Sequence, residues 1–218
     1  MATLTVTKGN IIGSARLEFA LAAGEVVLGI TRREVKRDTT YRAIAVNSSY
    51  PISASGNVYD YSPAYGVNMY RATISNGTTT TTITGEFTMD FTGLMVTNEG
   101  SNLRAVNVAA LLKYSRTMNH LHVVHQIPYR SGPPLVKYMP GDSRPASAEI
   151  LIGSPEGGLG DFEDKLNGLG ALVIRRPSLS QPDIIAAVMS YVLDHAEPDP
   201  MNQDATQWIA KLTLAEVV

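Results

Sequence analysis

Cysteine is absent from this chain of 218 residues. That absence excludes disulfide cross-links, thiolate nucleophiles and cysteine-based zinc sites. Charged residues make up only 17% of the sequence and the net charge is −2, whereas nucleic-acid-binding proteins of this size usually carry a basic surface. No segment approaches the ~18 consecutive apolar residues of a membrane-spanning helix. We therefore expect neither a nucleic acid nor a membrane span in the function of this protein.

The first residues also lack the features of an export signal. Met1 to Lys8 alternate in the manner of an edge strand, with no charged segment followed by an apolar one. We expect the protein to be made in the cytoplasm and to stay there until it joins a larger assembly. A chain of this length can form one large domain or two modest ones and bury roughly 70% of its unfolded surface.

Threonine is plentiful and lysine is scarce, a composition that favours strands over helices. The most informative stretch lies between Val58 and Gly77. Two alternating runs, Val58–Tyr61 and Asn68–Ile74, flank a turn rich in Ser, Pro and Gly, and Asn76-Gly77 predicts a type I′ hairpin. This succession of strands and turns is typical of a small β-sandwich, a module that normally binds or assembles.

Seven strand candidates at short, even spacing occupy the first unit of the chain. They are Thr3–Thr7, Ala15–Ala20, Val26–Ile30, Thr40–Val46, Val58–Tyr61, Met69–Ile74 and Thr79–Ile83. The charge-dense run from Thr31 to Asp38 lies between the third and the fourth candidates. We interpret that run as a solvated hairpin, in preference to a patch that binds phosphate or an anionic glycan.

A cluster of Gly, Ser and Asn at Thr97–Asn102 is typical of a linker. We therefore divide the chain into a β-sandwich at residues 1–86, a linker at 87–103 and a second β domain at 104–218. The elements expected in the second domain are Val106–Lys113, His120–Gln126, Leu135–Tyr138, Ala148–Ile152, Ala171–Ile174, Asp183–Leu193 and Trp208–Val217, most of them strands.

Two segments of the second domain are less regular. Asp161–Gly168 has acidic residues in its first turn, Phe162 and Leu166 four residues apart and a glycine at its end, so it predicts a short helix. The apolar run Ile184–Leu193 fits either one face of a helix or a strand buried on both sides. Periodicity alone does not decide between these two structures.

Few residues are spaced for catalysis or for binding a metal. His120 and His122 share one face of a predicted strand and could both reach a metal ion, but no third ligand lies at a useful spacing, so we prefer a polar strand surface or an interface. The acidic residues of segment 161–164 are better explained as charges at a helix N-terminus than as paired catalytic carboxylates. The glycine-rich segment 153–160 lacks the lysine of a phosphate-binding loop. We predict no enzyme, no metal site and no cofactor.

Two loops are the candidate contact surfaces. Tyr65 lies at a turn of the first unit, where its ring could stack on a sugar. The loop Tyr129–Pro134 is rich in Pro and Gly and is therefore expected to point outward, where the subunits of a ring often touch. The candidate surface residues are Tyr65, Tyr129, Arg130, Pro133, Pro134, His120 and His122.

Two blocks of the chain resemble known bacteriophage proteins. The first resembles a motif of the minor tail proteins of long-tailed (siphovirus) bacteriophages, especially those that infect actinobacteria. It consists of Tyr59-Asp60-Tyr61, Pro63, Gly66, Tyr70-Arg71-Ala72-Thr73 and Asn76-Gly77. The second is similar to the ring-forming β-barrel domain shared by tail-tube and distal tail proteins. It consists of Arg144-Pro145, Ala148–Ile152, the helix at Phe162–Leu166, Leu172–Pro177 and Trp208–Val217.

This resemblance implies a mainly β protein, with an immunoglobulin- or fibronectin-like β-sandwich followed by a β-barrel-like domain with one short helix. It favours a strand for Ile184–Leu193. It also implies a structural role in the virion tail, tail tip or baseplate, in a three-fold or six-fold ring with copies of itself and other tail proteins, and a contribution to attachment to host cell-wall glycan. The alternative is a carbohydrate-binding adhesin module that acts without ring assembly.

Overall fold

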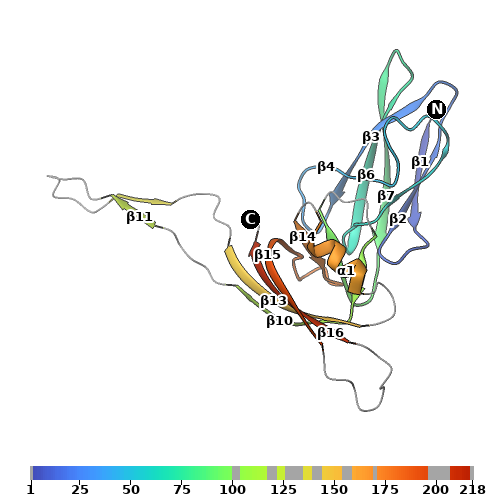
Figure 1. Cartoon of the computed structure of the whole chain (residues 1–218). Helices are drawn as coiled ribbons and strands as arrows, with labels where there is room; N and C mark the ends of the chain where they lie inside the picture. The colour runs from blue at the N-terminus through green and yellow to red at the C-terminus, as the bar shows by residue number, and fades with distance from the viewer. Residues whose placement is uncertain are drawn as a thin grey trace.

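The computed structural model describes residues 2–99, 104–116, 122–125, 135–138, 144–153, 159–168, 171–195 and 207–216. Within these ranges the chain is mainly β, as predicted, and it contains one short helix. Figure 1 shows the strands of the first half of the chain, coloured blue to green, beside a second group of strands coloured yellow-green to red. No helix in the described ranges has the length and apolar character needed to cross a membrane.

The first half of the chain forms two antiparallel sheets. The three-stranded sheet has the order β1-β2-β5 and the four-stranded sheet has the order β4-β3-β6-β7. Their strands are β1 (Thr3–Lys8), β2 (Ala15–Ala20), β3 (Val26–Glu34), β4 (Arg42–Ala43), β5 (Gly56–Asp60), β6 (Gly66–Ser75) and β7 (Thr80–Met89). All seven predicted strands are therefore confirmed, although β4 is shorter than expected and β3, β6 and β7 are longer.

The alternation of apolar residues along these strands gives each sheet one buried face. Leu17 and Phe19 from the three-stranded sheet and Ile30, Tyr70 and Ile74 from the four-stranded sheet belong to one hydrophobic cluster. Each of these side chains is at most 2% exposed. The two sheets consequently share a single core.

The turn between β6 and β7 differs from the predicted type I′ hairpin. The N–H of Asn76 donates to the carbonyl of Thr79 at 3.2 Å, so Gly77 occupies the first central position, where its φ of 86° is favourable for glycine. The side-chain oxygen of Asn76 accepts hydrogen bonds from the N–H groups of Thr78 and Thr79. Glycine at this position is typical of a type II′ turn.

The second half forms a seven-stranded antiparallel sheet with the order β10-β13-β16-β15-β14-β8-β9. Its strands are β8 (Leu94–Asn98), β9 (Val106–Val108), β10 (Ala110–Arg116), β13 (Arg144–Ile152), β14 (Leu172–Arg175), β15 (Ile184–His195) and β16 (Trp208–Glu216). Two further strands, β11 (His122–His125) and β12 (Leu135–Tyr138), pair with each other. The predicted linker at 87–103 overlaps the end of β7 and contains β8, a strand of this sheet.

The structure settles the two less regular segments of the second half. Ile184–Leu193 is a strand because it lies in β15, which pairs with β16 along nearly its whole length. The predicted helix is α1 (Leu159–Leu166). Phe162 and Leu166 are buried in the hydrophobic cluster of the seven-stranded sheet. Packing against the sheet, more than length, accounts for a helix this short.

The two ends of the seven-stranded sheet are formed by consecutive parts of the chain. Ala109 alone separates β9 from β10, and its N–H donates to the carbonyl of Leu151 in β13 at 2.9 Å. The segment 106–116 thus pairs with β8 through its first part and with β13 through its second. The strand order is nevertheless open, and the sheet is not a closed barrel.

Candidate functional site: a charge network between the two halves

The charge-dense run in β3 and the loop after it is the centre of the candidate site. The prediction that this run is solvated is wrong for its central residues, because the side chains of Arg32 and Glu34 are only 6% and 1% exposed. Strand alternation explains this result: Ile30, Arg32 and Glu34 share one face of β3, and that face points into the molecule. The charges of this strand are therefore part of the interior.

Arg32 links β3 to the end of β5. Its guanidinium donates to the carboxylates of Asp60 and Glu34. The hydroxyl of Tyr70 also donates to Asp60, at 3.0 Å. Burial and the neighbouring Asp60 carboxylate raise the pKa of Tyr70 well above its usual value, so its hydroxyl remains a donor. Asp60 thus has a positive and a neutral partner inside the protein.

Arg175, at the end of β14, connects this group to the second half of the chain. Its guanidinium donates to Glu34 at 2.6 and 2.7 Å, to Asp183 at 2.8 Å and to the carbonyl of Ser62 at 2.7 Å. Lys36 makes a second connection, because its ammonium lies 2.9 Å from the carboxylate of Asp183. The pairs Arg175–Glu34 and Lys36–Asp183 each join segments that are far apart in the sequence.

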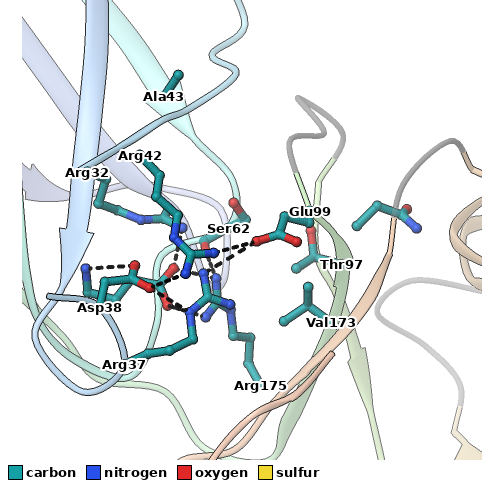
Figure 2. Close-up of a pocket in the computed structure, with 12 residues that line it drawn as sticks. Arg32, Arg37, Asp38, Arg42, Ala43, Ser62, Thr97, Glu99, Val173 and Arg175 are labelled. Atoms are coloured by element: carbon teal, nitrogen blue, oxygen red, sulfur yellow. Dashed lines mark hydrogen bonds and ion pairs between the residues drawn. The ribbon is translucent and has the colours of Figure 1, made fainter. Parts of the chain in front are cut away.

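A more exposed group of charges surrounds this buried one. Glu99, just after β8, lies 3.2 Å from Arg42 and 3.5 Å from Arg37, and Arg42 also pairs with Asp38 at 3.0 Å. Figure 2 shows Arg42 reaching toward Glu99 above Arg37 and Arg175. These side chains line a pocket of about 140 Å³ between the two halves.

We call the ten charged residues described above the interface network. Its members are Arg32, Lys36, Arg37, Arg42 and Arg175 with Glu34, Asp38, Asp60, Glu99 and Asp183. Five positive side chains face five carboxylates, so the network is balanced. Buried ion pairs contribute little net stability, because desolvation offsets their attraction, but removal of one partner is costly. The network therefore favours one relative placement of the two halves.

Glu34 illustrates the electrostatics of the network. Burial by itself would raise the pKa of its carboxyl group, but the guanidinium groups of Arg175 and Arg32 outweigh this effect and lower the pKa from 4.5 to about 2. The carboxylate is thus ionised at neutral pH. Within the described ranges, no group of three or more His, Asp or Glu side chains is placed to hold a metal ion.

The lowered pKa of Glu34 predicts acid-sensitive stability. A carboxyl whose pKa is lower in the folded state contributes stability that is complete above its unfolded pKa of 4.5 and is lost as the pH falls toward its folded pKa of about 2. At about pH 3, which lies between the two pKa values, we expect this loss to be about 2 kcal/mol. Urea unfolding at about pH 6 and about pH 3 measures it. In Glu34→Gln the difference between the two pH values should shrink by about this amount, and an unchanged difference would contradict the assignment.

Of the seven predicted surface residues, the structure describes Tyr65 and His122. Tyr65 is half-buried, and its ring packs edge-on against that of Phe91, with centroids 5.5 Å apart. His122 lies in β11. The other five candidates, His120, Tyr129, Arg130, Pro133 and Pro134, lie outside the described residues. Their proposed roles remain predictions.

Sequence reasoning misses the members of the network that lie outside the charge-dense run. Asp60 belongs to the first motif and Arg175 to a predicted strand, but neither is predicted to pair with a charge. One signal is present in the sequence. Arg32 and Glu34 follow Ile30, a predicted strand residue, at intervals of two residues. On a continued strand their side chains would therefore lie on the same face as the apolar Ile30, which predicts that they point inward. No signal in the sequence identifies Arg175 as their partner.

The network connects the first half of the chain to the second half, without by itself indicating a reaction or a ligand. The chain was compared with models of known families, with curated proteins and with solved structures. None of the three comparisons found a match.

Proposed function

We propose that this protein is a structural subunit of the tail or tail tip of a long-tailed bacteriophage and that it assembles into a ring. The proposal rests on the sequence resemblance together with the architecture of the two halves. In this proposal the first half is an immunoglobulin- or fibronectin-like sandwich and the second is a barrel-like domain of the tail-tube and distal tail type. The ring is located in the virion tail after synthesis in the host cytoplasm.

Two features of the fold support the domain assignments. The shared core of the first two sheets is the arrangement that a sandwich requires. The continuous segment 106–116, which pairs with β8 and with β13, brings both ends of the seven-stranded sheet to one part of the chain. A sheet whose ends lie this close is compatible with a barrel-like ring domain.

The interface network supports a structural role for the whole chain. A ring subunit must keep its parts in a constant relative position, because each contact with a neighbour repeats around the axis. Arg175 and Lys36 connect the two halves through side chains that are each 4% exposed. These buried pairs favour a rigid subunit over two modules on a flexible linker.

Within this proposal, the observation that carries assembly into a ring is the edge of β10. This strand pairs with β13 on one side and with no described strand on the other. Leu112, in the middle of β10, is a large apolar side chain that is 50% exposed. Leu112 lies at the bulge between Leu111 and Lys113 in the pairing of β10 with β13, and an open strand edge beside an exposed leucine can pair with another chain. In a ring, the neighbouring subunit covers this edge.

Light scattering coupled to size-exclusion chromatography tests the proposal, followed by negative-stain imaging of the main peak. We expect three-fold or six-fold rings. Leu112→Lys should shift the protein toward monomers, because a charge on an edge strand opposes pairing. Leu28→Lys is a matched control, since Leu28 lies in β3 of the four-stranded sheet and is 47% exposed; this variant should still form rings.

A monomer at all concentrations, or equal assembly of both leucine variants, would contradict ring formation through β10. The protein would then fit better with a carbohydrate-binding adhesin module that works without a ring. Loss of binding to host cell-wall glycan in Tyr65→Ala, with assembly unaffected, would support that alternative directly.

A further inference from the structure

The outer face of the four-stranded sheet carries two arginines that converge on one aromatic ring. The guanidinium carbon of Arg71, from β6, lies 3.8 Å from the centroid of the Tyr41 ring, and that of Arg33, from β3, lies 5.6 Å from it. Both distances are within the range of cation–π attraction. The ring therefore restricts the positions of two positive charges that neighbouring strands bring to the same place.

These two arginines differ from those of the interface network. Among the described residues, no salt bridge involves the side chain of either Arg33 or Arg71, whereas Arg32, beside Arg33 in sequence, has two buried carboxylate partners. Arg33 donates to the sulfur of Met69 at 2.7 Å, a weak acceptor. Arg71 is exposed and Arg33 is half-buried. The outer face thus has two guanidinium groups without a carboxylate partner among the described residues.

The surroundings are polar and carry little opposing charge. In the strand registers, Thr31 and Thr84 lie on either side of Arg71, and Glu86 lies across from Met69. Arg42, which follows Tyr41 in sequence, is engaged with Asp38 and Glu99. Glu86 is consequently the one acidic side chain on the described part of this face near the two arginines.

We propose that Arg33 and Arg71, held by Tyr41, bind a phosphate group. A guanidinium presents a planar fork of N–H donors that matches the oxygens of phosphate, and a tetrahedral oxyanion can accept from two such forks at once. The neighbouring threonine hydroxyls are suited to contacts with the hydroxyl groups of a phosphate-bearing glycan or polyol. This site goes beyond the proposed ring function and does not depend on it.

Titration of the protein with inorganic phosphate at low salt tests the site, with the Nε–H signals of arginine side chains followed by NMR. We expect the signals of Arg33 and Arg71 to shift together with one dissociation constant. Arg33→Ala and Arg71→Ala should each weaken binding roughly tenfold, because each removes charge-assisted hydrogen bonds. Tyr41→Phe, which keeps the ring, should bind like the parent protein, while Tyr41→Ala should bind more weakly.

Two further variants separate the site from general charge effects. Arg16→Ala removes the same charge from the other sheet, where Arg16 pairs with Glu18, and should leave phosphate binding unchanged. Glu86→Gln removes the opposing carboxylate and should strengthen binding. Equal loss in Arg16→Ala and Arg71→Ala, or no shift of the Arg33 and Arg71 signals, would overturn the proposal.

A second titration identifies the source of the phosphate. A glycerol–phosphate polymer that binds more tightly than inorganic phosphate, at equal phosphate concentration and with the same dependence on Arg33 and Arg71, would support a phosphate-bearing surface polymer as the ligand. Equal affinities would support free phosphate. Tighter binding to single-stranded DNA of the same phosphate content would overturn the glycan part of the proposal.

Discussion

Arg175→Ala is expected to lower the free energy of unfolding by about 3–5 kcal/mol, the range typical when one partner of a buried ion pair is removed. The guanidinium of Arg175 neutralises Glu34 and Asp183 and also donates to the carbonyl of Ser62. Without it, Glu34 keeps Arg32 as a partner and Asp183 keeps Lys36, but both carboxylates lose hydrogen bonds while they stay buried. Urea unfolding monitored by circular dichroism measures the loss.

A double-mutant cycle distinguishes the pair from the size of the side chains. We expect Glu34→Ala and Arg175→Ala to be strongly non-additive, because each single change leaves the other charge without its main partner. Lys211→Ala removes the cation of an exposed pair with Asp194 and should change stability little. Additive effects at Glu34 and Arg175 would show that the two side chains do not act as a pair.

The strands of the first half could be predicted because their pattern is local. Ala15–Ala20 alternates apolar and polar residues, and the structure places β2 at the same bounds. Each inward residue packs against an element whose own pattern is equally clear, so no distant information is needed to locate the strands. The order of those strands in two sheets depends on contacts between distant segments, and local alternation does not encode it.

The interface network could not be predicted in the same way. A run of charges is normally solvated, and only a partner elsewhere in the chain can make its burial favourable. That partner, Arg175, is 141 residues from Glu34. Composition and periodicity describe a strand and its faces, but they do not describe which distant charge meets that face.

The strand β15 shows a third situation. It contains the apolar run Ile184–Leu193, which fits either a helix or a strand. Which of the two forms depends on the neighbouring elements that cover the run. Pairing with β14 and β16 on its two sides supplies the backbone hydrogen bonds. Met189, at a bulge in this pairing, remains 66% exposed. Tertiary context therefore decides a question that local sequence leaves open.

Phe162→Ala is the second change for which we expect a loss of about 3–5 kcal/mol, since it would leave a cavity beside the seven-stranded sheet. Phe162 is 0% exposed, and α1 has no other aromatic residue to fill that space. Leu159→Ala is the control: Leu159 lies in the same helix and is only partly buried, so a much smaller loss is expected.

The single tryptophan makes this variant informative about the whole molecule. Trp208 packs against the cluster that contains Phe162, so its fluorescence reports the unfolding of the second half, whereas circular dichroism reports both halves. If the interface network joins the halves into one cooperative unit, the two signals of Phe162→Ala should change at the same urea concentration. In the double variant Phe162→Ala/Arg175→Ala, the fluorescence transition should occur at a lower urea concentration than the circular dichroism transition. Separate transitions in the parent protein would instead show that the two halves unfold independently and that the network does not couple them.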